Sequence, residues 1–330
     1  MNTLVEYAYL STDPVEKGIA NTIVKDCPLF EKLPFVTIVG NSLKYNMEAT
    51  EGGAQFYAVG EEWAESTPTW VQRSVSLAIL GGDADVDSYV AQTRSNVMDI
   101  EQEVISLKAK AIRDRFLKEL ILGYTTTTYD VNGFKGLLRL IAECETSSTT
   151  DLDAPNNSQV FAPAASAGTT MTLQHIDTLI HRVKGGKPDF LMMSYRSIEK
   201  LTGLCRAGGG NLTFGKTELG TEVQRYNGVT ILPNDFILDN YDDLDASSIL
   251  ALASYAQTTS RGSSDDNSPI FAFRVGGDGL VGLWNGGLQV EPIGTLETKD
   301  AKRTRIKMYA ALKLGNTRAA AVAIGITDGL

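Results

Sequence analysis

Residues 88–123, SYVAQTRSNVMDIEQEVISLKAKAIRDRFLKELILG, are the stretch that decides how this chain folds. No Gly or Pro occurs from Asp83 to Leu122, although the whole chain holds 31 Gly and 10 Pro. Apolar side chains recur there at spacings of three and four, the period of a helix face, at Val97, Ile100, Val104, Leu107 and Ala111. The stretch therefore predicts one long helix that packs by this stripe.

The apolar stripe widens toward the end of the stretch, at Ile112, Phe116, Leu120 and Ile121. Asp87 or Ser88 can cap the start, and Gly123 suits the left-handed residue that often follows a helix. Thirty-odd residues at about 1.5 Å each predict a rod of roughly 50 Å, whereas a compact chain of this length has a radius of gyration of only about 20 Å. One helix would cross the whole molecule, although a long core helix would also suit an ordinary enzyme.

Composition places the chain of 330 residues among globular proteins, because 43% hydrophobic residues suffice for a sizeable core in one or two domains. The net charge of −10 argues against a protein that coats nucleic acid by bulk electrostatic attraction. Cys27, Cys144 and Cys205 stand far apart and predict reduced, buried thiols. The N-terminus lacks the pattern of a signal peptide, and no apolar run reaches the eighteen or so residues of a membrane span.

Two strand-like runs, residues 35–45 and 70–80, flank a polar segment rich in Gly and Glu. In the second run apolar side chains alternate with polar ones, the period of a strand with one buried face. An isolated two-stranded ribbon is marginal in water, so the sequence predicts a long projecting hairpin supported by a neighbour. Residues 1–34 are broken by Pro14, Pro28 and Pro34 and predict an arm that lies on other elements.

The second half of the chain predicts a small α/β layer followed by strands separated by glycines. We expect helices over 171–186 and 195–204, and strands over 188–194, 226–235, 247–257, 279–294, 302–315 and 318–326.

One literal motif match tests whether the chain is a nucleotide-binding enzyme. Residues 210–217, GNLTFGKT, fit the phosphate-binding pattern G-x-x-x-x-G-K-[ST]. That loop works where a buried strand leads into it and a helix starts directly after it. Here a helix-like segment precedes the match, and glycine soon interrupts the residues after it, so the motif is a weak signal.

Other candidate sites for metal or catalysis are weaker still. Asp83, Asp85 and Asp87 begin like a calcium loop, but the Gly and Glu that the loop requires are missing, so these acids are expected to favour the helix start. His175 and His181 stand six residues apart without a Cys or carboxylate cluster, which argues against zinc. No nucleophile motif appears, so the sequence predicts no enzyme, no cofactor and no metal.

Charge is segregated along the chain. Residues 46–87 have a net charge of −7, with Arg73 opposing Glu48, Glu51, Glu61, Glu62, Glu65, Asp83, Asp85 and Asp87. Residues 299–318 have a net charge of +6, and a strand over 303–309 would place Arg303, Arg305 and Lys307 on one face. A solvated surface would explain either patch alone. Opposite patches on a chain with a projecting hairpin suggest docking between subunits.

The order of segments resembles a known family: an arm, LPFVTIVGNSLKYNMEA, an acidic projecting loop, a long helix, NGFKGLL, YNGVTILPND, SILALASYAQ and NTRAAAVAIGI. It is similar, over nearly all of the chain, to the major capsid proteins of tailed bacteriophages, whose Hong Kong 97-type fold encapsulins share. The resemblance implies an α+β fold with an N-terminal arm (1–34), an extended β-hairpin E-loop (35–82) and a spine helix (83–124). The rest of the peripheral P-domain is expected at 125–165 and 275–312, and the axial A-domain at 166–274 and 313–330.

The resemblance implies a structural protein that self-assembles into hexamers and pentamers of an icosahedral phage head around double-stranded DNA. It would occupy the virion, assemble in the cytoplasm of a host bacterium, and meet a portal protein at one vertex. Many relatives carry a scaffolding segment ahead of the arm, so any scaffold here is expected to be a separate protein or already removed. Decoration proteins are further possible partners. The alternatives are an encapsulin compartment around cargo protein and, more distantly, an enzyme built on residues 210–217.

The segregated charge predicts an intersubunit contact, and the resemblance predicts which residues face DNA. We expect an intersubunit contact between the acidic loop and the basic strand, formed by Glu48, Glu51, Glu61, Glu62, Glu65, Arg303, Arg305 and Lys307. We expect weak, sequence-independent contact with DNA from the spine helix, through Lys108, Lys110, Arg113, Arg115 and Lys118. Some relatives cross-link an E-loop lysine to a neighbour's asparagine. No lysine lies between Lys44 and Lys108, so we expect no such bond.

Overall fold

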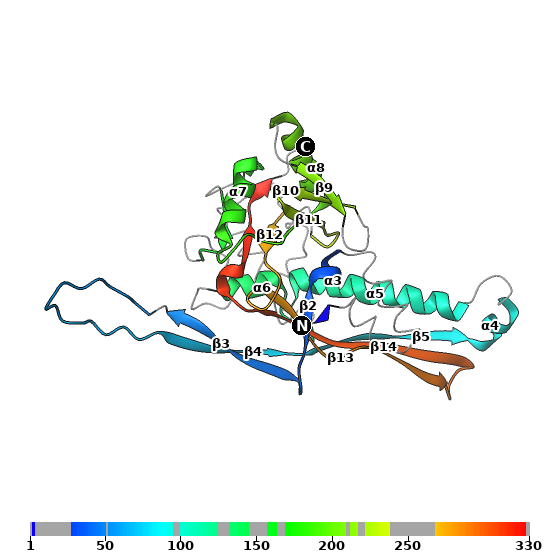
Figure 1. The fold of residues 1–330 in the computed structure, drawn as a ribbon. Helices are drawn as coiled ribbons and strands as arrows, with labels where there is room; N and C mark the ends of the chain where they lie inside the picture. Colours follow the sequence, from blue (N-terminus) through cyan, green and yellow to red (C-terminus); the bar gives the residue numbers. More distant parts are fainter. Residues whose placement is uncertain are drawn as a thin grey trace.

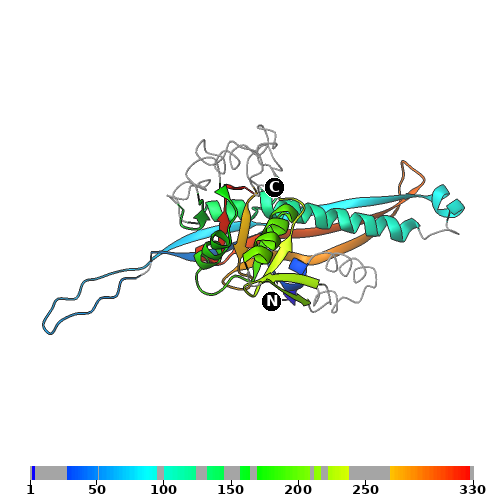
Figure 2. The same ribbon diagram turned by 90° about the horizontal axis from the view of Figure 1, so that it is seen from above.

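The computed structural model describes residues 2–3, 28–50, 52–94, 100–123, 132–144, 157–163, 169–208, 212–216, 222–237 and 268–327. It has two main sheets with a long helix between them and a hairpin that projects far beyond both (Figure 1). Seen from above, the hairpin extends from one side of the body, and the ends of the longest strands extend from the other (Figure 2). The layered body confirms the expected α+β class.

The lower sheet has five strands in the order β1-β2-β13-β14-β5. Their bounds are Asn2–Thr3, Pro34–Thr37, Leu280–Thr295, Ala301–Leu314 and Ala78–Asp87. β13 and β14 form a long antiparallel hairpin, and β2 lies parallel to β13. The approach of β2 requires glycine at position 282, because a Cβ there would lie 2.5 Å from the Phe35 ring.

The upper sheet has seven strands in the order β6-β15-β12-β8-β11-β10-β9. Their bounds are Val160–Phe161, Ala320–Ala323, Ile270–Phe273, Phe190–Met193, Val229–Pro233, Glu222–Tyr226 and Leu212–Lys216. Residues 190–193 and 270–273 are all buried, because helices cover one face of the sheet and the body covers the other. The turn from β10 to β11 is Asn227-Gly228, both at positive φ, which suits a two-residue hairpin.

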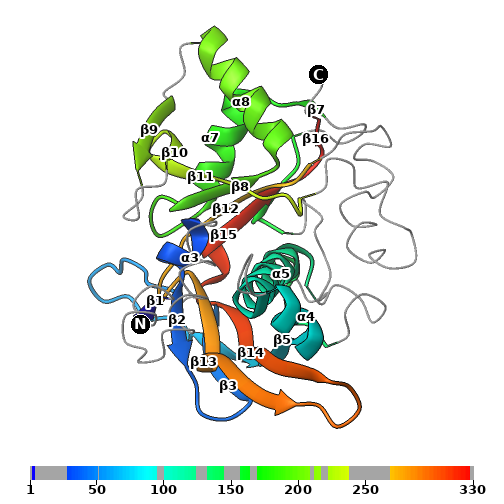
Figure 3. The same cartoon turned by 90° about the vertical axis from the view of Figure 1, so that its right-hand side faces the viewer.

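Helices α7 (Leu173–Arg182) and α8 (Tyr195–Gly208) form where helices were predicted, and both cover the outer face of the upper sheet (Figure 3). Thr172 caps α7 by accepting a hydrogen bond from the backbone N–H of His175. Three short elements complete the body: α3 (Pro28–Lys32), α6 (Leu137–Ala142) and the 3-10 turn η1 (Thr317–Ala319). Two further strands, β7 (Thr169–Thr170) and β16 (Ile326–Thr327), pair in parallel.

The structure describes two helices within the stretch predicted as one long helix, and residues 95–99 between them lie outside the described residues. α5 spans Ile100–Leu122, 23 residues or about 35 Å, and a separate helix, α4, spans Ser88–Arg94 at the far end of the molecule (Figure 1). Asp87 caps α4 by accepting hydrogen bonds from Tyr89 and Val90, as expected. Asp83 and Asp85 do not lie at a helix start, because β5 continues through them to Asp87.

The predicted stripe on α5 is not the face that packs. Leu107 is 55% exposed and Ala111 is also exposed, while Val97 lies outside the described residues. The buried face instead runs through Ala109, Ile112, Phe116 and Leu120. The second half of the helix therefore follows the sequence pattern and the first half does not. Apolar residues lie on more than one side of α5, so periodicity alone could not choose between them.

Both predicted strands of the projecting hairpin are broken into two. Residues 35–45 divide into β2, in the lower sheet, and β3 (Ser42–Thr50), and residues 70–80 divide into β4 (Thr69–Ser76) and β5. β3 and β4 pair alone as the projecting hairpin, from Ser42 opposite Ser76 to Thr50 opposite Thr69. Because of each break, one continuous segment of the chain contributes a strand to the lower sheet and a strand to the projecting hairpin. The expected strand over 247–257 lies outside the described residues.

The phosphate-loop alternative is contradicted by the local structure. Leu212–Lys216 is β9, an edge strand that pairs antiparallel with β10 along its whole length. A phosphate-binding loop requires a tight turn into a helix N-terminus, and the next described element is the strand Glu222–Tyr226. The described part of the match, residues 212–216, therefore does not have the structure of a phosphate-binding loop.

Substitution of Phe116 by Ala should lower the free energy of unfolding by about 3–5 kcal/mol, because the ring is 1% exposed and touches the aromatic rings of α3, β2 and residue 134. Leu107→Ala on the same helix is the control and should change it by less than about 0.5 kcal/mol. Urea denaturation of both variants, followed by circular dichroism, measures the difference. Equal losses would contradict the assignment of the buried face.

Candidate assembly surfaces

The tip of the projecting hairpin, residues 52–68, presents apolar side chains to solvent. Phe56 and Val59 are fully exposed, and Trp63 is 79% exposed. Side chains of this size seldom gather on a free surface, because burying each one against a partner gains roughly 1.5–3 kcal/mol. This apolar surface was not predicted from the sequence, because the Gly and Glu residues around Phe56, Val59 and Trp63 indicated a polar segment. The sequence did contain a signal of this surface, namely three large apolar residues in a segment without a partner strand.

The tip has internal structure of its own. The rings of Tyr57 and Trp63 stack with centroids 4.5 Å apart. The Tyr57 hydroxyl accepts a hydrogen bond of 3.1 Å from the backbone N–H of Ala64, and the backbone N–H of Gly53 donates to Ser66 Oγ at 2.7 Å. These contacts close the loop on itself, so Phe56 and Val59 are held outward without ordering by a partner. A preorganised contact surface costs less entropy on binding.

The basic strand β14 alternates as predicted, with Thr304, Ile306 and Met308 buried. Its outer face, however, forms ion pairs within the chain. Arg303 meets Asp85 through two hydrogen bonds of 2.6 Å, and Arg305 meets Asp83 through bonds of 2.7 and 2.9 Å. Lys307 Nζ lies 2.6 Å from Glu291. We call these pairs the β5–β14–β13 ion ladder. Hydrogen bonds from Arg305 lower the pKa of Asp83, and those from Arg303 lower the pKa of Asp85.

The acidic partners predicted for this strand lie elsewhere on the chain. Glu61, Glu62 and Glu65 are exposed at the hairpin tip, Glu48 lies on β3, and Glu51 is outside the described residues. Their contact with a neighbouring subunit stays a prediction. Such a contact would have to compete with the ladder, or add to it, because Arg303, Arg305 and Lys307 already have carboxylate partners.

The cations of α5 do not share one environment. Lys110 is exposed, Arg113 pairs with Asp114 at 2.7 Å, and Arg115 lies 4.0 Å from the buried carboxylate of Glu119. Lys108 and Lys118 are half-buried, and the Lys108 chain lies over Gly82 of β5. Contact of these five cations with DNA stays a prediction. Lys110, on the exposed side of the helix, is best placed for it.

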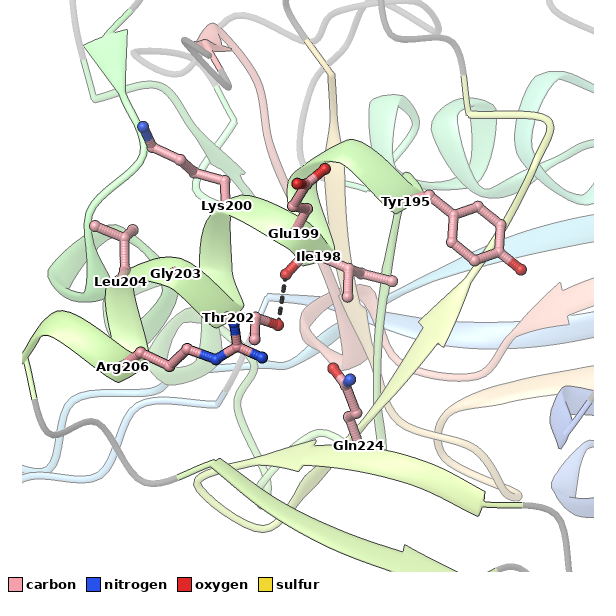
Figure 4. Close-up of a pocket in the computed structure, with 9 residues that line it drawn as sticks. All are labelled: Tyr195, Ile198, Glu199, Lys200, Thr202, Gly203, Leu204, Arg206 and Gln224. Carbon is pink, nitrogen blue, oxygen red and sulfur yellow. Dashed lines mark hydrogen bonds between the residues drawn. The ribbon is translucent and has the colours of Figure 1, made fainter.

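A groove of about 540 Å³ lies between α8 and β10 (Figure 4). It is lined by Tyr195, Ile198, Glu199, Lys200, Thr202, Gly203, Leu204, Arg206 and Gln224. Gln224 reaches toward the helix from β10, while Glu199 and Lys200 extend from the other side of the α8 ribbon. The Thr202 hydroxyl donates to the Ile198 carbonyl oxygen at 2.8 Å, a bond within its own helix. The lining holds no paired nucleophile and base.

The rest of the described chain offers no metal centre and no membrane span. No group of three His, Cys, Asp or Glu side chains among the described residues is placed to hold a metal ion. None of the helices in the described ranges is both long and apolar enough to cross a membrane. Cys144 and Cys205 are buried free thiols, as predicted, and Cys27 lies outside the described residues.

Comparison with solved structures identifies the fold. The encapsulin SrpI of Synechococcus elongatus PCC 7942 matches with a TM-score of 0.62 at 18% identity, over 92% of this chain and 88% of that one. The capsid of a native GTA particle gives 0.59 at 13% identity, over 93% and 91%. A structure from Mycobacterium phage Bobi gives 0.56 at 13% identity, over 92% and 89%.

The chain has the Hong Kong 97-type capsid fold. In the terms of that fold, the β3–β4 hairpin with its tip is the E-loop and α5 is the spine helix. No family model and no curated protein matches the sequence, so the likeness lies in the arrangement of elements. The sheets cross two of the expected domain boundaries. β5 extends from the predicted E-loop into the predicted spine. β6 lies within 125–165, which was expected to belong to the P-domain, but it joins the upper sheet, whose other strands lie in the segments expected to form the A-domain. The domain division itself stays a prediction.

The ion ladder should make stability depend on pH. The pKa of Asp83 and of Asp85 is lower in the folded chain than in the unfolded one. Their contribution to the free energy of unfolding is therefore fully present at a pH above the usual carboxyl pKa, and it is lost as the pH falls through the lowered pKa values. An Asp83→Asn, Asp85→Asn double variant should have a lower melting temperature than the parent at pH 7. This gap in melting temperature should close as the pH falls below about 4. Calorimetric scans from pH 7 to pH 2 measure it.

The matched control is Asp278→Asn, which removes an exposed carboxylate outside the ladder. This variant should show no comparable gap at pH 7. At neutral pH the gap of the double variant should also narrow with added salt, because the ladder is partly exposed. A gap that stays constant down to pH 2 would contradict the assignment.

Proposed function

We propose that this chain is the subunit of a closed protein shell, the major capsid protein of a tailed phage, built from hexamers and pentamers around double-stranded DNA. The observation that carries the proposal is the E-loop. It stands clear of the body with a preorganised tip whose Phe56 and Val59 are fully exposed (Figure 1). A monomer would gain nothing from this surface and would risk aggregation. A second copy of the chain can bury it, and the fold is that of shell-forming proteins.

The phage assignment also rests on the residues of the arm and of the entry to the E-loop, LPF…GNS, which look more like the phage branch of the fold. It brings the partners of a phage head as proposals: a portal protein at one vertex, and separate scaffolding or decoration proteins. Location in the virion after assembly in a bacterial cytoplasm belongs to the same proposal. A structural role without enzymatic activity belongs to the same proposal, and the shell-forming structures that share the fold support it.

The second candidate is an encapsulin compartment, favoured by the TM-score of 0.62 to the SrpI encapsulin. The two candidates differ in what the shell holds. Purified particles of the phage type should protect double-stranded DNA from nuclease when isolated from infected cells, whereas an encapsulin should co-purify with a defined protein. Particles that contain a stoichiometric protein and no protected DNA would replace the first assignment by the second.

Shell formation should depend on the apolar tip. The expressed chain should give particles of megadalton size in size-exclusion chromatography and in negative-stain electron microscopy. Phe56→Ser with Val59→Ser should keep the fold and abolish shells, because it removes the apolar area that a neighbour would bury. The matched control, Glu61→Gln with Glu62→Gln and Glu65→Gln, should still assemble but with altered salt dependence. Shells from the apolar variant would contradict the role of the tip.

Mature particles should carry no covalent cross-links between subunits. The E-loop lacks a lysine from Met47 through the tip to Ser76, so an amine nucleophile is missing there, and the guanidinium of Arg73 stays protonated. Denaturing electrophoresis should give one band at the chain mass of 35.6 kDa. A ladder of oligomers that persists under reducing conditions would show that another residue supplies the bond.

A further inference from the structure

The E-loop leaves the body at one pair of residues. Tyr45 of β3 and Arg73 of β4 lie directly opposite each other in the hairpin. Tyr45 packs against the main core, and Lys313 Nζ lies 4.6 Å from the centre of its ring. One step farther out, Gln72 hydrogen-bonds Asn46 across the hairpin, and Trp70 is already 65% exposed. The Tyr45–Arg73 pair is therefore the pivot of the hairpin.

Glu143 of the body holds this pivot through its backbone carbonyl oxygen and, at longer range, through its carboxylate. Arg73 Nη2 donates to the backbone carbonyl oxygen of Glu143, and Arg73 Nη1 lies 3.8 Å from its carboxylate. Lys135 Nζ and Arg139 Nε bond the same carboxylate at 2.9 and 2.7 Å. Glu143 is the residue that follows α6, whose five buried residues fix it in the core. Its side chain is only 11% exposed.

Three cationic side chains, those of Arg73, Lys135 and Arg139, surround the single carboxylate of Glu143. In the described part of the chain, no second carboxylate pairs with Arg73, Lys135 or Arg139. A carboxylate that is largely withdrawn from water interacts more strongly with its partners than an exposed one. If Glu143 lost its charge, mutual repulsion among the three cations would replace attraction, and this would weaken the hold on Arg73 and on the strand that carries it.

A small rotation at the pivot has a large effect at the tip. About a dozen residues at about 3.3 Å each place the tip roughly 40 Å from the Tyr45–Arg73 pair. A rotation of about 10° there would move Phe56 and Val59 by roughly 7 Å, by simple leverage over that length. A displacement of that size exceeds the tolerance of a packed apolar contact, because a gap of only about 0.5–1 Å already removes roughly a quarter to a half of the attraction between the surfaces.

We propose that Glu143 is a positioning residue for assembly: it sets the direction of the E-loop by holding Arg73, and so determines where the apolar tip meets the next copy of the chain. The consequence for assembly rests on the proposed function, whereas the link between Glu143 and the hairpin direction does not. The residue contributes no area to the contact itself. Its role is exerted roughly 40 Å away, through the paired strands β3 and β4 and then through the contacts that close the tip.

The test compares three substitutions in one cluster. Glu143→Gln removes the charge, and Arg73→Gln removes the link from the hairpin side while Glu143 keeps Lys135 and Arg139. Lys135→Gln is the matched control, because it removes one cation and leaves the Arg73–Glu143 link in place. Spin labels on cysteines introduced at Gln55 in the tip and Lys184 in the body, with the native cysteines replaced, report the distance distribution between them in the dissociated chain.

Glu143→Gln and Arg73→Gln should each broaden or shift the distance distribution by several ångströms and reduce the yield of regular shells roughly tenfold or more, while the melting transition stays cooperative. Lys135→Gln should leave both the distances and the shells as in the parent. Unchanged distances in Glu143→Gln and Arg73→Gln would overturn the proposal, and so would changed distances with shells of normal yield and form. If the parent forms no shells at all, the proposed function fails, and the distances still decide whether Glu143 directs the hairpin.

Discussion

Burial of one face of α5 is the constraint on which the rest of the structure depends. Viewed along its axis, the helix lies between the lower sheet and the upper sheet (Figure 3). Phe116 occupies the centre, with ring centroids 5.2 Å from Phe30 and Phe134 and 6.4 Å from Phe35. Those rings come from three separate segments, so one side chain joins the N-terminal region, the lower sheet and the segment before α6. The helix packs on β5 and β14 of the lower sheet and on α6, which in turn packs on β15 of the upper sheet.

The E-loop is the opposite case, an element with almost no core of its own. Its stem packs through Leu43, Tyr45 and Val75, and the described tip, residues 52–68, projects into solvent. Its stability is therefore limited, while its direction is well defined, because Arg73 is held by Glu143 at the pivot. This division suits a shell subunit. The body supplies a rigid base, the pivot supplies an angle, and the apolar tip supplies the contact that a second copy completes.

Charged side chains have three different roles in this acidic chain. The ion ladder joins β5, β14 and β13 within one subunit, at partly exposed positions where salt and acid weaken it. The cluster around Glu143 is more withdrawn from water and links the hairpin to the body. The carboxylates of the tip, Glu61, Glu62 and Glu65, remain exposed and available to a partner. A net charge alone would distinguish none of these roles.

The sequence by itself determined the hairpin, the helices α7 and α8, the alternation along β14 and the second half of the α5 core face, because each follows from local spacing of apolar residues, while the α+β class came from the order of segments that resembles a known family. It could not decide which of two apolar sides of the first half of α5 packs, where β5 ends, or that Asp83 and Asp85 pair with Arg305 and Arg303. Those outcomes depend on segments more than 200 residues apart, which only the tertiary structure brings together. The partnership of Arg73 with Glu143 is of the same kind, since neither residue has a local reason to meet the other.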